Sequence, residues 1–439
     1  ATLKLRRLNV AERLYRITGA GCYRDTMLLG QRAPVRHPLL NSQVVGQDSA
    51  QAAEYHGKIY WFWGDTTRLS YPLGNFHTSG ATSELPGAGG LDPGVGVDVI
   101  YFTNRDGFCK PMAPMPGPGV VWLDGLLTAP DSHGCQRLVA HYSRMASLTE
   151  RLEHGLAVWN DAKEQFEKAV QFDNADHWRC PQNHPIRVRE GGRDYFYFLQ
   201  PDRAVRVQAE LADLERPPAY EAFTCLAVHS HDDQTVTNVA RDADGRLIWT
   251  WQTNLPPLGA TEEHKLIEAG EIKESEARFQ LRDVDSGWPV RIHIGVVNWN
   301  PFRKRWILIG EQIGGISSYL GEIWYAESGS PVGPWKWAKK IVTHNDYTFY
   351  NPLVHPFFDQ DNGRLIYFEG TYASTFSGNK HPTPRYDYNQ IMYRLDLSDS
   401  CLQSVEERDG ENGAESGSTM RNIPPGGKSA FVPPGSPRQ

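Results

Sequence analysis

The stretch GKIYWFWGDT (57–66) decides the fold, because a glycine turn is followed at once by a short run of aromatic and aliphatic residues. Such a run is apolar on both faces, which is typical of a strand buried between neighbouring sheets. Five further stretches repeat a polar turn before an apolar run, mostly about every 50 to 80 residues. They are CQRLVAHYSR (135–144), GGRDYFYFLQ (191–200), GRLIWTWQT (245–253), KRWILIGEQ (304–312) and GRLIYFEGTY (363–372).

The composition supports an all-β protein. The chain of 439 residues contains 13 Trp, 19 Tyr and 17 Phe, and aromatic residues favour strands. Its 41 Gly and 30 Pro supply the turns that keep the strands short. Aromatic strands that recur between turns predict a radial repeat, and we interpret the chain as a five-bladed β-propeller, with six blades as the alternative. The run at 245–253 is assigned to the outer part of the third blade.

The two ends of the chain differ from its middle. We expect an N-terminal strand with irregular structure over residues 1–45 and the propeller over residues 46–402. Residues 403–439 are rich in Gly, Pro and Ser, so we expect them to form a disordered tail. The stretch EEHKLIEAGEIKESEARFQL (262–281) is the best helix candidate, and we expect it to form a short helical insertion on a loop.

The charge balance narrows the class of partner. The chain has 45 basic and 52 acidic residues, and its net charge of −7 argues against nucleic acid or an anionic membrane as the main partner. No apolar run approaches 18 residues, so membrane insertion is not expected. The six cysteines form no CxxC pair, which argues against a zinc ribbon. The oligomeric state is left open.

Polar residues stand at one end of each apolar hairpin. In antiparallel strands, residues equidistant from the turn face each other with Cβ atoms about 4.5–5.5 Å apart. This rule pairs Asp48 with Asp65 across the turn His56-Gly57. Since the inner strands of a propeller line its channel, we expect one such pair per blade at the channel mouth. The other pairs are Asp124 with Tyr142, Asn183 with Gln200, His293 with Glu311, and, within one residue, Asn351 with Glu369.

Two close carboxyl groups suit glycoside hydrolysis. One donates a proton to the leaving oxygen, while the other attacks the anomeric carbon or activates a water. Repulsion between them raises the pKa of one, as an acid that works near neutral pH requires. We therefore predict a glycoside hydrolase with Asp48 and Asp65 as catalytic residues. The structural alternative is that Asp65 caps a turn and Asp48 bonds backbone amides.

Further polar side chains are expected around the same mouth. Glu311 and Glu369 are additional catalytic candidates. An arginine near the last blade suits the carboxylate or sulfate of an acidic sugar. The predicted substrate-binding residues are Asp124, Asn183, His184, His293, Tyr350, Asn351, His355 and Arg385.

Three histidines could together bind a metal ion. His184, His293 and His355 come from three blades at comparable depths. Neutral imidazoles that converge on a channel suit a divalent cation. No cofactor is otherwise expected, so a structural or catalytic cation in the channel is the one alternative that the sequence leaves open.

Two motifs resemble known propeller glycosidases. The stretch GEIWYAESGSPVGPW (321–335) is similar to a blade motif of five-bladed glycosidases, including glycoside hydrolase family 43. The stretch IYWFWGDT (59–66), with Asp48 before it, resembles the first blade of the endo-D-arabinanase family, formerly a domain of unknown function. The second resemblance implies that Asp48 is the acid/base and Asp65 the nucleophile. The likeness in fold covers roughly residues 40–400.

The third blade departs from the family 43 pattern. That family places a Glu there, whereas CPQNHPIRV (180–188) offers Asn183 and His184. Either the first-blade pair acts alone, or Glu311 or Glu369 replaces the missing acid, or the reaction differs. The rival functions are a polysaccharide lyase that uses His or Tyr with Arg, with or without a metal, and a non-catalytic carbohydrate-binding propeller. We expect a carbohydrate partner and a secreted or periplasmic location.

Overall fold

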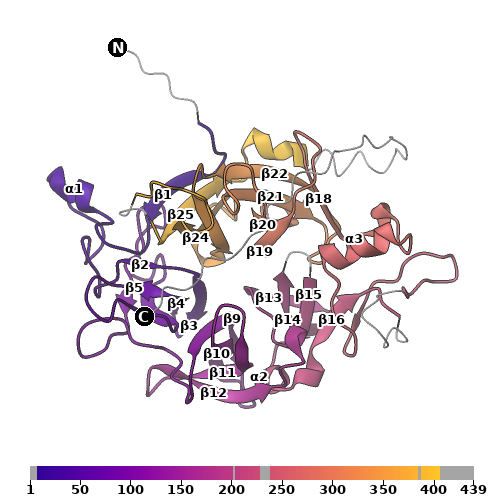
Figure 1. Ribbon diagram of the computed structural model, residues 1–439, viewed down its shortest axis with the longest axis horizontal. Helices are drawn as coiled ribbons and strands as arrows, with labels where there is room; N and C mark the ends of the chain where they lie inside the picture. The colour runs from indigo at the N-terminus through magenta and orange to yellow at the C-terminus, as the bar shows by residue number, and fades with distance from the viewer. Residues whose placement is uncertain (1–6, 201–202, 228–237, 384–386, 406–439) are drawn as a thin grey trace, which may run out of the picture.

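The computed structural model describes residues 7–200, 203–227, 238–383 and 387–405. These residues are mostly strands, and they form five sheets of four or five strands and one small sheet of three. Figure 1 shows the five larger sheets arranged around a common centre. The prediction of an all-β chain is confirmed, and the arrangement is consistent with a propeller fold.

The five larger sheets follow one another along the chain. The first contains β3 (Gln51–Tyr55), β4 (Lys58–Trp63), β7 (Ser79–Glu84) and β8 (Ile100–Tyr101). The second contains β9 (Val120–Pro130), β10 (Gln136–Met145), β11 (Arg151–Asn160) and β12 (Gln165–Phe172). The third contains β13 (Pro185–Glu190), β14 (Arg193–Gln200), β15 (Arg203–Gln208), β16 (Glu221–Thr224) and, outermost as predicted, β17 (Thr250–Gln252).

The last two sheets complete the circuit. The fourth contains β18 (Phe279–Asp283), β19 (Ile292–Asn300), β20 (Arg305–Gln312), β21 (Glu322–Ser328) and β22 (Trp335–Thr343). The fifth contains β23 (Thr348–Val354), β24 (Leu365–Ala373), β25 (Asn389–Asp396) and β1 (Glu12–Arg16). Neighbouring strands are antiparallel except β18, which runs parallel to β22. Because β1 pairs with β25, the N-terminal strand completes the sheet built by the C-terminal strands.

One edge strand of each larger sheet lies toward the centre, where β3 contacts β9, β9 contacts β13, and β19 contacts β23. The small sheet of β2 (Gly46–Gln47), β5 (Thr66–Thr67) and β6 (Gly74–Asn75) extends the first sheet at one end. The aromatic run in β4 is buried, with Trp61, Phe62 and Trp63 at most 1 % exposed. These rings pack between neighbouring sheets, which explains why the strand is apolar on both faces.

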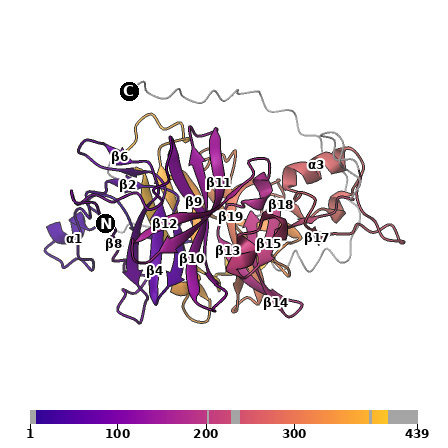
Figure 2. The same cartoon turned by 90° about the horizontal axis from the view of Figure 1, so that it is seen from below.

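Few of the described residues are helical. They form α1 (Arg24–Leu28), α2 (Leu211–Leu214) and α3 (Ala260–Glu268), besides short 3₁₀ turns. Seen from below, α1 and α3 lie at opposite ends of the molecule (Figure 2). No helix among the described residues is long and apolar enough to span a membrane.

The helix predicted over 262–281 is confirmed only in its first half. Gly270 follows α3 with a φ of +75°, a conformation that ends helices. The predicted helix beyond it is wrong, because Phe279 and Leu281 alternate into the core as strand β18.

The predicted tail begins too early at residue 403. Leu402 and Val405 are fully buried in a core cluster with Tyr393 and Leu395. Apolar contacts with strand β25 therefore hold the chain as far as residue 405. Residues 406–439, which make up the rest of the predicted tail, lie outside the described residues.

Candidate active site

Asp48 and Asp65 lie side by side at one end of the first sheet. The turn His56-Gly57 has positive φ values of 50° and 73°, which suit a tight hairpin, and the β3–β4 register runs from it without a bulge. Beyond the paired strands, the backbone N–H of Asp65 donates to Oδ1 of Asp48 at 2.8 Å. The structure thus brings together the two acids that hairpin symmetry pairs. Gly64 allows this approach, since a Cβ there would lie 2.4 Å from Oδ1 of Asp48.

Hydrogen-bond donors surround the carboxylate of Asp48. The hydroxyl of Tyr350 donates to its Oδ2 at 3.1 Å. The side chains of Tyr388 and Ser49 also hydrogen-bond to it. Burial raises the pKa of Asp48, while the bonds from Tyr388, Tyr350 and the amide of Asp65 oppose that rise. These donors solvate the charged form in place of water.

Asp65 has a different environment. Its Oδ1 is buried and accepts no hydrogen bond from the described residues. The nearby indole of Trp122 lowers the pKa of Asp65 slightly, although its N–H donates to the carbonyl of Phe76 at 3.0 Å. Burial and then the negative charge of Asp48 raise the pKa of Asp65 to about 7. Asp65 therefore takes up and releases its proton near neutral pH, and the negative charge of Asp48 favours the protonated form. Two acids held apart in this way can act as acid and base in one reaction.

A second polar cluster adjoins Asp48 through Ser49. The side-chain amide of Asn351 donates to Oγ of Ser49 at 2.7 Å, and its backbone N–H donates to Oε2 of Glu311 at 3.1 Å. Nδ1 of His293 lies 3.6 Å from Oε1 of Glu311, so this predicted pair is also brought together. The side chain of Glu311 is 0 % exposed and that of His293 is 43 % exposed. His293 is therefore open to solvent on one side and contacts the buried Glu311 on the other.

Asp124 joins the second and third sheets to the first. Its Oδ1 accepts from Nε2 of Gln51 at 3.1 Å and from the backbone N–H of Asn183 at 2.9 Å. Burial raises the pKa of Asp124 to about 6. Burial, and then the charge of His355, lower the pKa of His184 to about 3. His184 is therefore a neutral imidazole at the start of the third sheet.

Strained backbone gathers around these side chains. Ser49, Asn183, Asn351 and Tyr388 have φ values of 55°, 80°, 53° and 57°. Such conformations cost residues other than glycine of order 1–3 kcal/mol and persist only where neighbours fix them. All four take part in the hydrogen bonds just described, and strain of this kind clusters at binding and catalytic sites. The strained residues thus lie in the same region of the structure as Asp48, Asp65 and their hydrogen-bond partners.

Two predictions in the second and third sheets need correction. Asp124 faces His141 rather than Tyr142, because the β9–β10 register shifts beside Gly125, whose φ is +58°. The register of β13 and β14, extended past the start of β13, would pair Asn183 with Gln200. Asn183 instead turns to Asp124.

Glu369 and His355 lie apart from the cluster. Glu369 faces Leu353 rather than Asn351, because the β23–β24 register shifts between Tyr350 and Leu353. Nε2 of His355 lies 2.8 Å from Oε1 of Glu369, and both side chains are 0 % exposed. The His355 ring packs edge-on against Trp61. Neither side chain is exposed to a ligand, which argues against the catalytic and substrate-binding roles predicted for them.

The described residues do not form the cation site that the sequence leaves open as an alternative. His355 is bonded to Glu369, and the part of the chain that the structure describes contains no group of three or more His, Cys, Asp or Glu side chains that could hold a metal. Arg385, the predicted clamp for an acidic sugar, lies outside the described residues.

Several residues of the site were missed by the sequence argument. Ser49 follows Asp48 and Gly64 precedes Asp65 in the sequence, and this adjacency could have identified them as residues of the site. Trp122 and Tyr388 reach the acids from the second and fifth sheets. No local pattern announces contacts of that kind, because they depend on how the sheets are placed.

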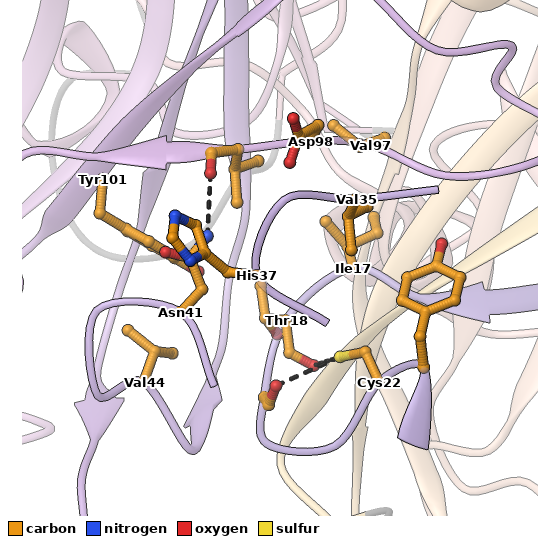
Figure 3. Close-up of a pocket in the computed structure, with 13 residues that line it drawn as sticks. Ile17, Thr18, Cys22, Val35, His37, Asn41, Val44, Val97, Asp98 and Tyr101 are labelled. Atoms are coloured by element: carbon orange, nitrogen blue, oxygen red, sulfur yellow. Dashed lines mark hydrogen bonds between the residues drawn. The ribbon is translucent and has the colours of Figure 1, made fainter. Parts of the chain in front are cut away.

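The cavity in Figure 3 lies elsewhere, between the loop after β1 and strand β8. The thiol of Cys22 donates to the carbonyl oxygens of Thr18 and Gly19 at 3.2 Å each. Nδ2 of Asn41 donates to the carbonyl of Val99 at 2.9 Å. The cavity encloses about 30 Å³, which suits water molecules and is too small for a sugar ring.

No family model matches the sequence, and no curated protein matches it. Among solved structures, a provisionally named hydrolase from Bacteroides ovatus is 11% identical, with a TM-score of 0.49, over 93% of this chain and 99% of that chain. An exo-β-1,3-galactanase from Phanerochaete chrysosporium is 10% identical, with a TM-score of 0.41, over 88% and 65%. An α-L-arabinofuranosidase from Fusarium graminearum is 13% identical, with a TM-score of 0.39, over 89% and 98%.

Proposed function

We propose that the protein is a glycoside hydrolase acting on a polysaccharide or oligosaccharide, on a five-bladed propeller in which each of the five larger sheets is one blade. The observation that carries the proposal is the pair Asp48 and Asp65. One acid is surrounded by donors that stabilise its charge, and the other has a pKa of about 7 and a buried oxygen that accepts no bond from the described residues. Glycoside hydrolysis needs two carboxyl groups in these two states.

In this proposal Asp65 is the acid and Asp48 the nucleophile. Asp65 gives its proton to the glycosidic oxygen while the Asp48 carboxylate attacks the anomeric carbon. A water molecule then cleaves the glycosyl ester and returns a proton to Asp65. Facing positions on paired strands, with Cβ atoms about 5 Å apart, favour retention of configuration. The resemblance to the endo-D-arabinanase family implies the opposite roles. The donors around Asp48, and their absence among the described residues at Oδ1 of Asp65, support this assignment.

The surrounding groups have supporting roles in the proposal. The hydroxyl of Tyr350 keeps Asp48 charged and oriented through its bond to Oδ2. His293, which Glu311 holds in place, is exposed and can donate to or accept from a sugar hydroxyl. Burial keeps His184 neutral, so it adds a polar contact without a charge.

A polysaccharide lyase is the second candidate, and one observation favours it. His293 is exposed with a buried carboxylate behind it, as a general base requires. Tyr350 does not suit that role, because burial raises its pKa far above the usual range and its hydroxyl already donates to Asp48. A lyase would leave an unsaturated product that absorbs in the near ultraviolet.

Product analysis tests the proposal. Wild type and the variants Asp48→Asn, Asp65→Asn and His293→Ala are incubated with a panel of neutral and acidic glycans. New reducing ends with wild type that are lost in both Asp variants are the expected result. Activity that survives both changes, an unsaturated product that depends on His293, or no turnover on the panel would contradict it.

Asp359→Asn is the matched control for this test. Burial raises the pKa of Asp359 to about 7, and its Oδ1 is also buried without a hydrogen bond from the described residues. Asp359 thus shares these two properties with Asp65. Unlike the pKa of Asp65, that of Asp359 is raised by burial with no contribution from a second acid. Full activity in this variant shows that a loss in Asp65→Asn comes from the pair and not from removing a buried acid.

A further inference from the structure

A large hollow lies beside the candidate active site, between the second and third sheets. Residues 175–182 of the loop before β13, strands β14 and β15, and residues 256–258 before α3 contribute to its wall. Its volume is about 510 Å³, within the range of pockets that bind small molecules. Gln182 lines the hollow, and the next residue, Asn183, donates to Asp124. The hollow therefore adjoins the contact between Asn183 and Asp124.

The wall of the hollow offers a flat ring and a cation. Trp178 is half-buried, and the guanidinium of Arg179 stacks on its ring at 4.4 Å. The guanidinium of Arg151 contacts Nδ1 of His177, and no carboxylate among the described residues forms an ion pair with it. Arg203, by contrast, donates to both carboxylate oxygens of Glu262, at 2.9 and 3.1 Å. Arg151 is thus the cation of this wall whose charge remains open to an anion.

The charges of the wall differ from those of the acid pair. The hollow is lined by two arginines and a single acid, Glu262. An anionic group beside the charged Asp48 would be repelled, whereas in the hollow it would meet Arg151. A guanidinium matches the flat, paired oxygens of a carboxylate or sulfate. The indole of Trp178 adds an apolar face of the kind that packs against the C–H face of a sugar ring.

We propose that this hollow is a subsite for an anionic sugar unit, with Arg151 on its carboxylate or sulfate and Trp178 against its ring. The inference rests on the proposed function and makes its substrate an acidic glycan. Glucuronate, glucose 6-sulfate and glucose are the probes, because they separate the two anion sources from the neutral ring. Binding is followed by NMR on the indole N–H signals of full-length protein labelled with ¹⁵N-tryptophan. The signal of Trp178 is the one that disappears in the variant Trp178→Phe.

At least one of the two anions is expected to shift the Trp178 signal with a Kd at least tenfold lower than that of glucose. Arg151→Gln should abolish this preference, and Arg151→Lys should retain part of it. Arg32→Gln, which removes the same charge at an exposed position, should keep it in full. Tighter binding of glucuronate identifies a uronate, and tighter binding of the sulfate identifies a sulfate ester.

Equal binding of all three sugars, or a preference for the anions that persists in Arg151→Gln, would overturn the inference. If Arg151→Gln fails to fold, Trp178→Ala provides the second variant, and unchanged Kd values in it would also overturn the inference. Asp65→Asn should keep the preference, because free monosaccharides are bound and not cleaved. Failure of the subsite therefore leaves the test of Asp48 and Asp65 intact, and failure of the hydrolase proposal leaves anion binding measurable.

Discussion

The pair Asp48 and Asp65 and the pair Glu369 and His355 both stand on hairpins rich in aromatic residues, yet the structure places them differently. The first two side chains are partly exposed at one end of their sheet, and the other two are fully buried. Each pair leaves one buried carboxyl oxygen without a hydrogen bond from the described residues, so that feature does not separate them. The two pairs differ in the solvent exposure of their side chains and in the residue that each acid has as its partner, which is a second acid for Asp65 and a histidine for Glu369.

The difference shows what converts a polar pair into a candidate for catalysis. An acid beside an imidazole finds a complementary partner, so Oε1 of Glu369 and Nε2 of His355 form a hydrogen bond with each other. The pKa of Asp65 is raised by burial and then by the negative charge of Asp48 beside it, because two adjacent acids do not both ionise readily. We therefore expect substitutions in the first pair to change activity and those in the second to change stability.

The largest effect is expected from Asp65→Asn. An amide of the same shape cannot give a proton to the leaving oxygen, so kcat should fall about a thousandfold. Thermal unfolding should show that the fold is kept, because a buried acid is replaced by a neutral group. Hydrolysis within tenfold of wild type would remove Asp65 from the mechanism.

Glu369→Ala should give the largest loss of stability. The change leaves His355 buried without its partner, and breaking a buried pair of this kind costs about 3–5 kcal/mol. The free energy of unfolding in urea measures it, and kcat per folded molecule should stay close to wild type. A stable variant with lost activity would reverse the comparison between the two pairs.

Gly64→Ala should sharpen the comparison by moving Asp48 without removing it. The new Cβ would lie 2.4 Å from Oδ1 of Asp48, so the carboxylate must shift. A misplacement of about 1 Å can reduce kcat about a hundredfold. Gly329→Ala is the matched control, since its Cβ would meet the nearest described atom, on Arg305, at an ordinary 3.5 Å. Equal activities of the two variants would contradict the proposed need for close approach.

Tyr350→Phe should have the smallest effect of the four. It removes one donor to Oδ2 of Asp48 and leaves those from Tyr388, Ser49 and the amide of Asp65. A hydrogen bond to a charged group contributes about 1.5–3 kcal/mol, so kcat should fall at least about tenfold. The pKa of Asp48 should rise, which moves the acidic limb of the pH–rate profile upward. An unchanged profile would show that Tyr350 does not support the charge of Asp48.

The sequence predicts the site where the hairpins are regular and misses it where they are not. Asp48 faces Asp65 because β3 and β4 pair without a bulge around a two-residue turn. Asp124 and Glu369 miss their predicted partners because register shifts near Gly125 and between Tyr350 and Leu353 move one strand against the other. Counting residues from a turn cannot detect such a shift.

The aromatic runs predict the buried strands because their pattern is local. The helix prediction over 262–281 exceeds α3 because the apolar residues after Gly270 also fit the alternating period of β18. The hydroxyl of Tyr388 and the indole of Trp122 reach the acids only through the placement of whole sheets. A single sequence carries no signal for that placement.

The most direct test of the account is the titration of Asp65 and Asp48, followed by NMR on ¹³C-labelled aspartate carboxyl groups and assigned with the two Asn variants. It needs no knowledge of the sugar. The account predicts that Asp65 titrates near pH 7 and is the proton donor below that pH, with activity falling as pH rises through 7. It also predicts that Asp48 titrates at lower pH than Asp65. An Asp65 that titrates below pH 5, or an Asp48 that titrates at higher pH than Asp65, would contradict the assignment of acid and nucleophile.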